Sequence, residues 1–268
     1  MSRSITLVVL LLVSTATATS EGRADIIYSY NAGLGTLPTT QGWTLYQDSP
    51  NLPAPTVSAG ILHQFPNPNP PQSQFWFQNS VPLNFSTTSY TYELDLHIIS
   101  SNYINFGSAQ RSGYYMLAFD QIGRGFAVGI AGNGITINTD ENFNPNNGVR
   151  FTPFNTTDGF HLYRLTIGQG VGSLFIDGTL FASTPLALAP GRDPGNFNGV
   201  YFGDGSGVGV SESELRSARF GILATPEPAT LLVFGVGAVG LLAARLRRRV
   251  AGQLAPVSEA TGIDPAGG

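Results

Sequence analysis

The sequence predicts an all-β protein of the sandwich or barrel class, with a terminal signal at each end. Between residues 25 and 223, short runs of alternating apolar and polar residues are separated by Gly, Pro, Asn and Asp, as expected of strands joined by turns. The chain holds 33 Gly and 18 Pro, and only 11% of its residues are charged, which also favours a turn-rich β protein. One domain of about 200 residues is therefore expected.

The clearest strand is predicted over residues 90–98, where Tyr, Leu and Ile alternate with Thr, Glu, Asp and His. Asp177-Gly178 separates two apolar runs and is a strong signal for a two-residue hairpin turn. Asp204, set among glycines, is expected to be a turn residue rather than a ligand. Further strands are expected at 113–120, 125–131, 135–140, 160–167, 173–176, 179–183, 199–202 and 218–223.

The composition excludes several classes of chemistry. All 13 basic residues are Arg, so Schiff-base chemistry and the lysine of a phosphate-binding loop are excluded. The absence of Cys excludes disulfides, thiol nucleophiles and the lipid-modified cysteine of a lipoprotein. Between residues 21 and 224, eight Arg stand against fourteen Asp and Glu, a net charge of −6 that disfavours nucleic acid as a partner. The three His are too scattered for a known metal spacing, and neither a metal nor a cofactor is predicted.

The N-terminus has the features of a secretory signal peptide over residues 1–18. Arg3 supplies a positive charge, and residues 5–13 form an apolar run. An Ala-Thr-Ala segment offers small residues at the positions that signal peptidase reads, so cleavage is expected after Ala18, with Ala24 as the alternative. The run is shorter than the roughly 20 residues of a membrane span, which argues against the other interpretation, an uncleaved anchor.

The C-terminal region combines a Pro-Glu-Pro motif, an apolar segment and an arginine cluster. Pro226 and Pro228 keep the motif extended, because proline lacks an amide donor and disfavours helical backbone before it. Residues 231–244 carry no charge and are predicted to form the core of one transmembrane helix, although it spans only about 21 Å. The helix is followed by an arginine cluster, Arg245, Arg247, Arg248 and Arg249. This positive charge should stay in the cytoplasm and so place residues 25–223 on the opposite side of the membrane.

This arrangement resembles the PEP-CTERM sorting signal of bacterial surface proteins over residues 225–249. The resemblance implies that Pro226, Glu227 and Pro228 are recognition positions for an exosortase, a membrane transpeptidase. Signal peptidase is expected to remove the N-terminal leader. The protein is then expected at the membrane with its body outside the cytoplasm, and after processing at the cell surface or in the extracellular matrix. Residues 250–268 extend beyond the usual end of such signals and are expected to be polar and disordered. A plain C-terminal anchor would have the same hydropathy and orientation.

Two parts of the body resemble concanavalin A-like, LamG-like jelly rolls. They are residues 161–167 with 174–178, and residues 201–206. The resemblance implies an antiparallel jelly-roll sandwich over residues 25–223. Two sheets packed face to face would bury the alternating aromatic residues and make the domain stable without disulfides.

A polar strand face at Glu93, Asp95 and His97 gives the sharpest enzymatic hypothesis. It resembles the Glu-x-Asp-x-Glu strand of laminarinase-type glycosidases, in which the two glutamates act as nucleophile and acid/base. His97 stands where the second glutamate belongs, and a retaining glycosidase needs two carboxyl groups about 5 to 5.5 Å apart. No catalytic residue is therefore assigned, and a solvent-facing polar stripe is the preferred interpretation.

The preferred function is that of an exported surface protein, not an enzyme, whose sandwich binds glycan or another surface partner. Trp43, Trp76 or Phe77 would stack on sugar rings if exposed, although such residues more often belong to the core. The alternatives are an exported laminarinase-like hydrolase built on Glu93 and a structural coat protein without a specific ligand.

Overall fold

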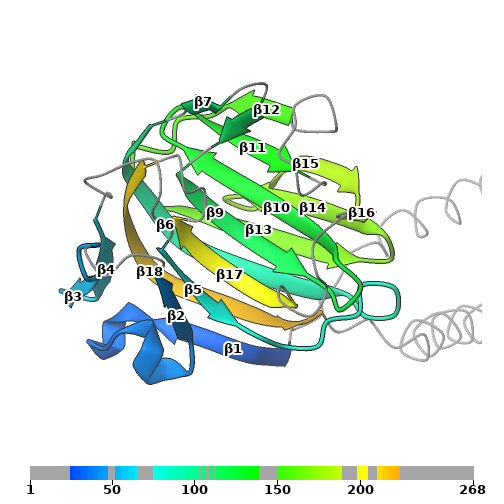
Figure 1. Cartoon of the computed structure of the whole chain (residues 1–268), viewed down its shortest axis with the longest axis horizontal. Helices are drawn as coiled ribbons and strands as arrows, with labels where there is room; N and C mark the ends of the chain where they lie inside the picture. Colours follow the sequence, from blue (N-terminus) through cyan, green and yellow to red (C-terminus); the bar gives the residue numbers. More distant parts are fainter. Residues whose placement is uncertain are drawn as a thin grey trace, which may run out of the picture. The chain divides into compact units, whose positions relative to one another are not determined.

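The computed structural model describes residues 25–47, 52–65, 75–102, 104–106, 109–111, 113–138, 150–188, 198–204 and 210–223. They form two large antiparallel sheets packed as a sandwich, which confirms the predicted fold class (Figure 1). No helix within these ranges is long and apolar enough to cross a membrane. The predicted signal peptide, sorting motif, transmembrane helix and polar extension all lie outside the described residues.

The first sheet has the strand order β15-β14-β13-β6-β18-β4-β3, and β1 also pairs with β18. Its centre is formed by β6 and β18, two strands of 13 residues that pair in antiparallel register from Tyr90↔Ile222 to Asn102↔Val210. The strands of this sheet are β1 (Asp25–Asn31), β3 (Thr56–Ser58), β4 (Ile61–Gln64), β6 (Tyr90–Asn102), β13 (His161–Gly168), β14 (Val171–Ile176), β15 (Thr179–Pro185) and β18 (Val210–Ile222).

The second sheet has the order β12-β11-β10-β9-β17-β5-β2, with the short β16 on β10. Its strands are β2 (Thr44–Gln47), β5 (Phe75–Asn79), β9 (Tyr114–Phe119), β10 (Arg124–Ala131), β11 (Gly134–Asn138), β12 (Arg150–Pro153), β16 (Ala187–Leu188) and β17 (Gly199–Asp204). The small elements are the hairpin of β7 (Ile104–Phe106) and β8 (Ala109–Arg111) and the 3-10 helices η1 (Ala32–Leu34) and η2 (Pro38–Gln41).

The core lies between the two sheets, and strand alternation decides which side chains reach it. On β6, Leu94 and Leu96 are fully buried, whereas the intervening Asp95 points outward, as the sequence predicts. The Tyr92 hydroxyl donates a hydrogen bond of 3.0 Å to the Tyr201 carbonyl oxygen and so joins the sheets. The β14–β15 hairpin turns at Asp177-Gly178, whose φ angles of 51° and 80° suit the predicted two-residue turn.

Candidate functional site

The outer face of the first sheet, which points away from the core, carries a row of charged side chains. In the strand register, Glu93 on β6 lies between Arg164 on β13 and Arg219 on β18. Burial raises the pKa of Asp95, although the nearby charges of Arg216 and Arg219 partly oppose the shift. The Arg216 guanidinium lies 4.0 Å from the Asp95 carboxylate. The row therefore balances its acids with arginines.

The structure places His97 beside a carboxylate that the sequence pattern did not identify. His97 Nδ1 lies 3.0 Å from Glu214 Oε2, because β18 pairs with β6 at that point. His97 is four residues from Glu93, which is about 13 Å along a strand. That separation exceeds the carboxyl spacing of both retaining and inverting glycosidases, about 5 to 9.5 Å. Glu93 and Glu214 are therefore not placed as a glycosidase pair.

Glu214 also joins two more polar side chains from neighbouring strands. Its Oε1 lies 3.4 Å from His63 Nδ1 on β4. The other ring nitrogen, His63 Nε2, lies 3.3 Å from the hydroxyl of Ser58 at the end of β3. The side chains of His63, Glu214 and His97 are 27%, 20% and 21% exposed, so the group is largely withdrawn from water.

The third histidine, His161, is held by two carboxylates at the start of β13. His161 Nδ1 lies 2.7 Å from Asp177, and Nε2 lies 2.8 Å from Asp158. Burial alone would lower the pKa of His161, but the hydrogen bonds and charges of the two carboxylates outweigh it and raise the pKa. Burial alone would raise the pKa of Asp177, but the hydrogen bonds of His161 and the Leu162 amide lower it. This arrangement fastens the β14–β15 turn to β13.

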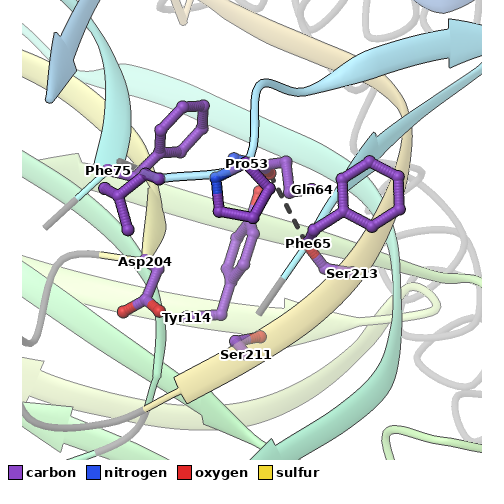
Figure 2. Close-up of a pocket in the computed structure, with 9 residues that line it drawn as sticks. Pro53, Gln64, Phe65, Phe75, Tyr114, Asp204, Ser211 and Ser213 are labelled. Carbon is purple, nitrogen blue, oxygen red and sulfur yellow. Dashed lines mark hydrogen bonds between the residues drawn. The ribbon is translucent and has the colours of Figure 1, made fainter. Parts of the chain in front are cut away.

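A pocket of about 10 Å³ lies at one end of the sandwich, between strands of the two sheets (Figure 2). It has room for about one water-sized group. The first sheet contributes polar residues from β4 and β18, and the second contributes residues from β5, β9 and β17. The lining residues are Leu52, Pro53, Gln64, Phe65, Phe75, Tyr114, Asp204, Ser211 and Ser213.

Three buried polar atoms in this pocket have no hydrogen-bond partner among the described residues. They are Gln64 Nε2, the Tyr114 hydroxyl and Ser211 Oγ, on side chains that are 5%, 0% and 2% exposed. Burial raises the pKa of Tyr114 well above its ordinary value, so its hydroxyl keeps its proton as a donor. A buried polar atom left without a partner costs about 1 to 3 kcal/mol. The pocket is thus a place where a polar group of a ligand gains hydrogen bonds.

Asp204 was expected to be a turn residue, but it is the last residue of β17 and is only 8% exposed. Its carboxylate lines the pocket, and Figure 2 shows it on the same side as Tyr114 and Ser211. Phe65 stands at the other side beside Pro53 and is 42% exposed. The pocket therefore has polar side chains in its interior and a partly exposed aromatic ring at its edge.

The three aromatic residues proposed for stacking have different positions. Trp43 and Phe77 are 2% and 0% exposed and belong to the core, where the Trp43 ring packs edge-on against Phe202. Trp76 belongs to a separate cluster on the outer face of the second sheet. Tyr46, which is 42% exposed, stacks on Trp76 with ring centres 4.5 Å apart. Of the three proposed residues, Trp76 alone lies outside the core between the sheets.

The described part of the chain holds no group of three or more His, Asp or Glu side chains that could bind a metal ion. The sorting positions Pro226, Glu227 and Pro228 and the predicted cleavage position Ala18 fall outside that part, as do the four orienting arginines. The roles of these residues therefore stay predictions from the sequence.

Separate comparisons with known proteins support the C-terminal sorting motif and the sandwich fold. Residues 224–249 match the model of the PEP-CTERM protein-sorting motif. A carbohydrate esterase from the Shiga toxin-encoding bacteriophage phi24B has a similar fold, with a TM-score of 0.52 and 12% identity, covering 75% of this chain and 100% of its own. The endo-β-1,3-glucanase of Pyrococcus furiosus has a TM-score of 0.50 and 10% identity, covering 77% and 97%. No curated protein matches the chain in sequence.

At these identities the similarity concerns the fold alone. The chain thus carries a PEP-CTERM sorting motif and a concanavalin A-like jelly-roll sandwich. The motif indicates an exported surface protein that is processed at the membrane.

Proposed function

We propose that the protein is an exported bacterial surface or matrix protein whose sandwich binds glycan through the pocket at the end of the two sheets. Its sorting tail delivers it, and exosortase and signal peptidase act on it as processing enzymes. The observation that carries the binding proposal is the set of unpaired buried atoms on Gln64, Tyr114 and Ser211.

The chemistry of the pocket suits a sugar hydroxyl. Gln64 Nε2 is a donor, the Asp204 carboxylate is an acceptor, and the hydroxyls of Tyr114 and Ser211 are both. A sugar hydroxyl donates and accepts, so one such group can satisfy several of the three unpaired atoms on Gln64, Tyr114 and Ser211. The volume admits only that group, and the rest of the sugar ring would lie outside against Phe65. Glycans offer both a hydroxyl for the pocket and a sugar ring that can stack on Phe65.

Glycan-array binding by the full-length protein tests this assignment with three variants. Phe65→Ala removes the stacking ring, and Ser211→Ala removes an unpaired hydroxyl. We expect each to weaken binding about tenfold, which corresponds to about 1.4 kcal/mol. Ser211→Ala should leave the free energy of unfolding unchanged or raise it by up to about 1 kcal/mol, because it removes an unpaired buried group. Tyr46→Ala is the matched aromatic control and should bind normally.

Each outcome has a clear consequence. If only Tyr46→Ala weakens binding, the Tyr46–Trp76 pair is the glycan site and the pocket is not. If the unaltered protein binds no glycan, the binding proposal is wrong and a structural coat role is favoured. Release of sugar from a bound glycan, lost in Glu93→Gln, would instead support the hydrolase alternative.

A further inference from the structure

Ser58, His63 and Glu214 have the connectivity of a nucleophilic site, and they lie apart from the glycan pocket. Gln64 and Ser213 line the pocket on the inner face of the first sheet, whereas His63 and Glu214 lie on its outer face. From these contacts we infer that Ser58, His63 and Glu214 form a site that hydrolyses carboxylic esters. The proposal does not rest on glycan binding.

The ring of His63 connects the other two side chains through opposite nitrogen atoms. Nε2 lies 3.3 Å from the Ser58 hydroxyl and can accept its proton when the ring proton is on Nδ1. Nδ1 lies 3.4 Å from Glu214 Oε1, within ion-pair distance. This is the arrangement in which a histidine removes a proton from a serine while a carboxylate fixes its tautomer. The Ser58–His63 distance is at the long end of the hydrogen-bond range, as often found before substrate binds.

His97 fixes Glu214 from the other side. Its Nδ1 lies 3.0 Å from Glu214 Oε2, and its Nε2 lies 3.4 Å from the Thr157 carbonyl oxygen. Each carboxylate oxygen of Glu214 therefore lies within 3.4 Å of an imidazole nitrogen. Glu214 and His97 do not touch a substrate, so they are positioning residues.

The backbone beside Ser58 adds a second observation. Ala59 and Gly60, with φ 50° and 77°, form the two-residue turn of the β3–β4 hairpin, with nearly the same φ angles as Asp177-Gly178. Ser58 is exposed and directly precedes that turn, so its hydroxyl is open to a substrate. The neighbouring amides of Ala59 and Gly60 are the candidate donors for a developing oxyanion.

The reaction balances without an oxidant or a cofactor. Ser58 Oγ bonds to the ester carbonyl carbon and passes its proton to His63 Nε2. The tetrahedral oxyanion then expels the alcohol, which takes the proton from His63. Water next attacks the acyl-serine and gives a proton to His63. The carboxylic acid leaves as Ser58 recovers that proton. The net reaction is ester plus water to alcohol plus acid.

The full-length protein is tested with p-nitrophenyl acetate as substrate and with a fluorophosphonate probe located by peptide mass spectrometry. We expect the probe on Ser58, and Ser58→Ala should lower hydrolysis about a hundredfold. His63→Gln should lower hydrolysis and labelling together, and Glu214→Gln should change the pH profile of hydrolysis. Ser29→Ala removes an exposed serine of β1 and should change nothing.

A purely structural role for these contacts gives a different result. Ser58→Ala and His63→Gln would then change thermal stability without changing hydrolysis or labelling. The inference is overturned if the unaltered protein does not hydrolyse the ester, if Ser58 is not labelled, or if Ser58→Ala keeps the full rate.

Discussion

The outer faces of the two sheets differ in what they present. The outer face of the first sheet carries charged residues such as Glu93 and Arg219, together with the Ser58–His63–Glu214 group. The outer face of the second sheet carries Trp76 and Tyr201, which are buried although they point away from the core. In the first sheet a strand therefore needs to be apolar on one face only, whereas in the second it is apolar on both.

The largest difference between the two outer faces is expected in the free energy of unfolding when one outward side chain on each sheet is truncated. Trp76→Ala should lower the free energy of unfolding by about 3 kcal/mol, because it empties a buried aromatic site. Glu93→Ala, at an outward position of the first sheet, should cost less than about 1 kcal/mol, because Glu93 is only half-buried and its neighbour Arg219 is exposed. Urea unfolding measures both. Equal losses would contradict the proposed difference between the faces.

A smaller effect is expected from pH at His161 on the first sheet. The raised pKa of His161 means that its contribution to stability is complete below about pH 6.5 and is lost as the pH rises through the raised value. The lowered pKa of Asp177 means that its contribution is lost as the pH falls through that lowered value. The advantage of the unaltered protein over His161→Gln should therefore be greatest in mildly acidic solution.

The size of this advantage should stay below about 1 kcal/mol, because Asp158 and Asp177 are 56% and 54% exposed. Thermal unfolding of both proteins across the pH range measures it. The cost of Trp76→Ala should not change in mildly acidic solution, since the ring contacts Tyr46, Tyr201 and Gln78 rather than a carboxylate or an imidazole. A His161→Gln penalty that grows in alkaline solution would contradict the assigned contacts.

The same difference explains how far the sequence could predict the fold. Alternation on β6 assigned Leu94 and Glu93 to opposite faces correctly, because one face meets water. On β10 and β17 nearly every residue is buried, so the pattern indicated strands but not their inner and outer sides. The short strands before residue 65 gave too little pattern to be predicted.

The candidate sites depended on contacts that no local pattern contains. Ser58 and His63 share one hairpin, but Glu214 reaches them only through the pairing of β4 with β18. The pocket likewise joins Asp204 and Ser211 from strand ends to Gln64, far away in sequence. Asp204 in particular was predicted as a turn residue because its neighbours are glycines, whereas the sheet places it at a strand end.

Export and membrane processing through the C-terminal motif are the central claim, and the mature C-terminus tests it most directly. Mass spectrometry of intact protein from membrane and released fractions gives that terminus. We expect the released form to end near Pro226–Pro228 and to lack the apolar segment 231–244, and alanine at the three motif positions should leave the protein uncut in the membrane fraction. An unprocessed C-terminus at Gly268 in every fraction would contradict the account.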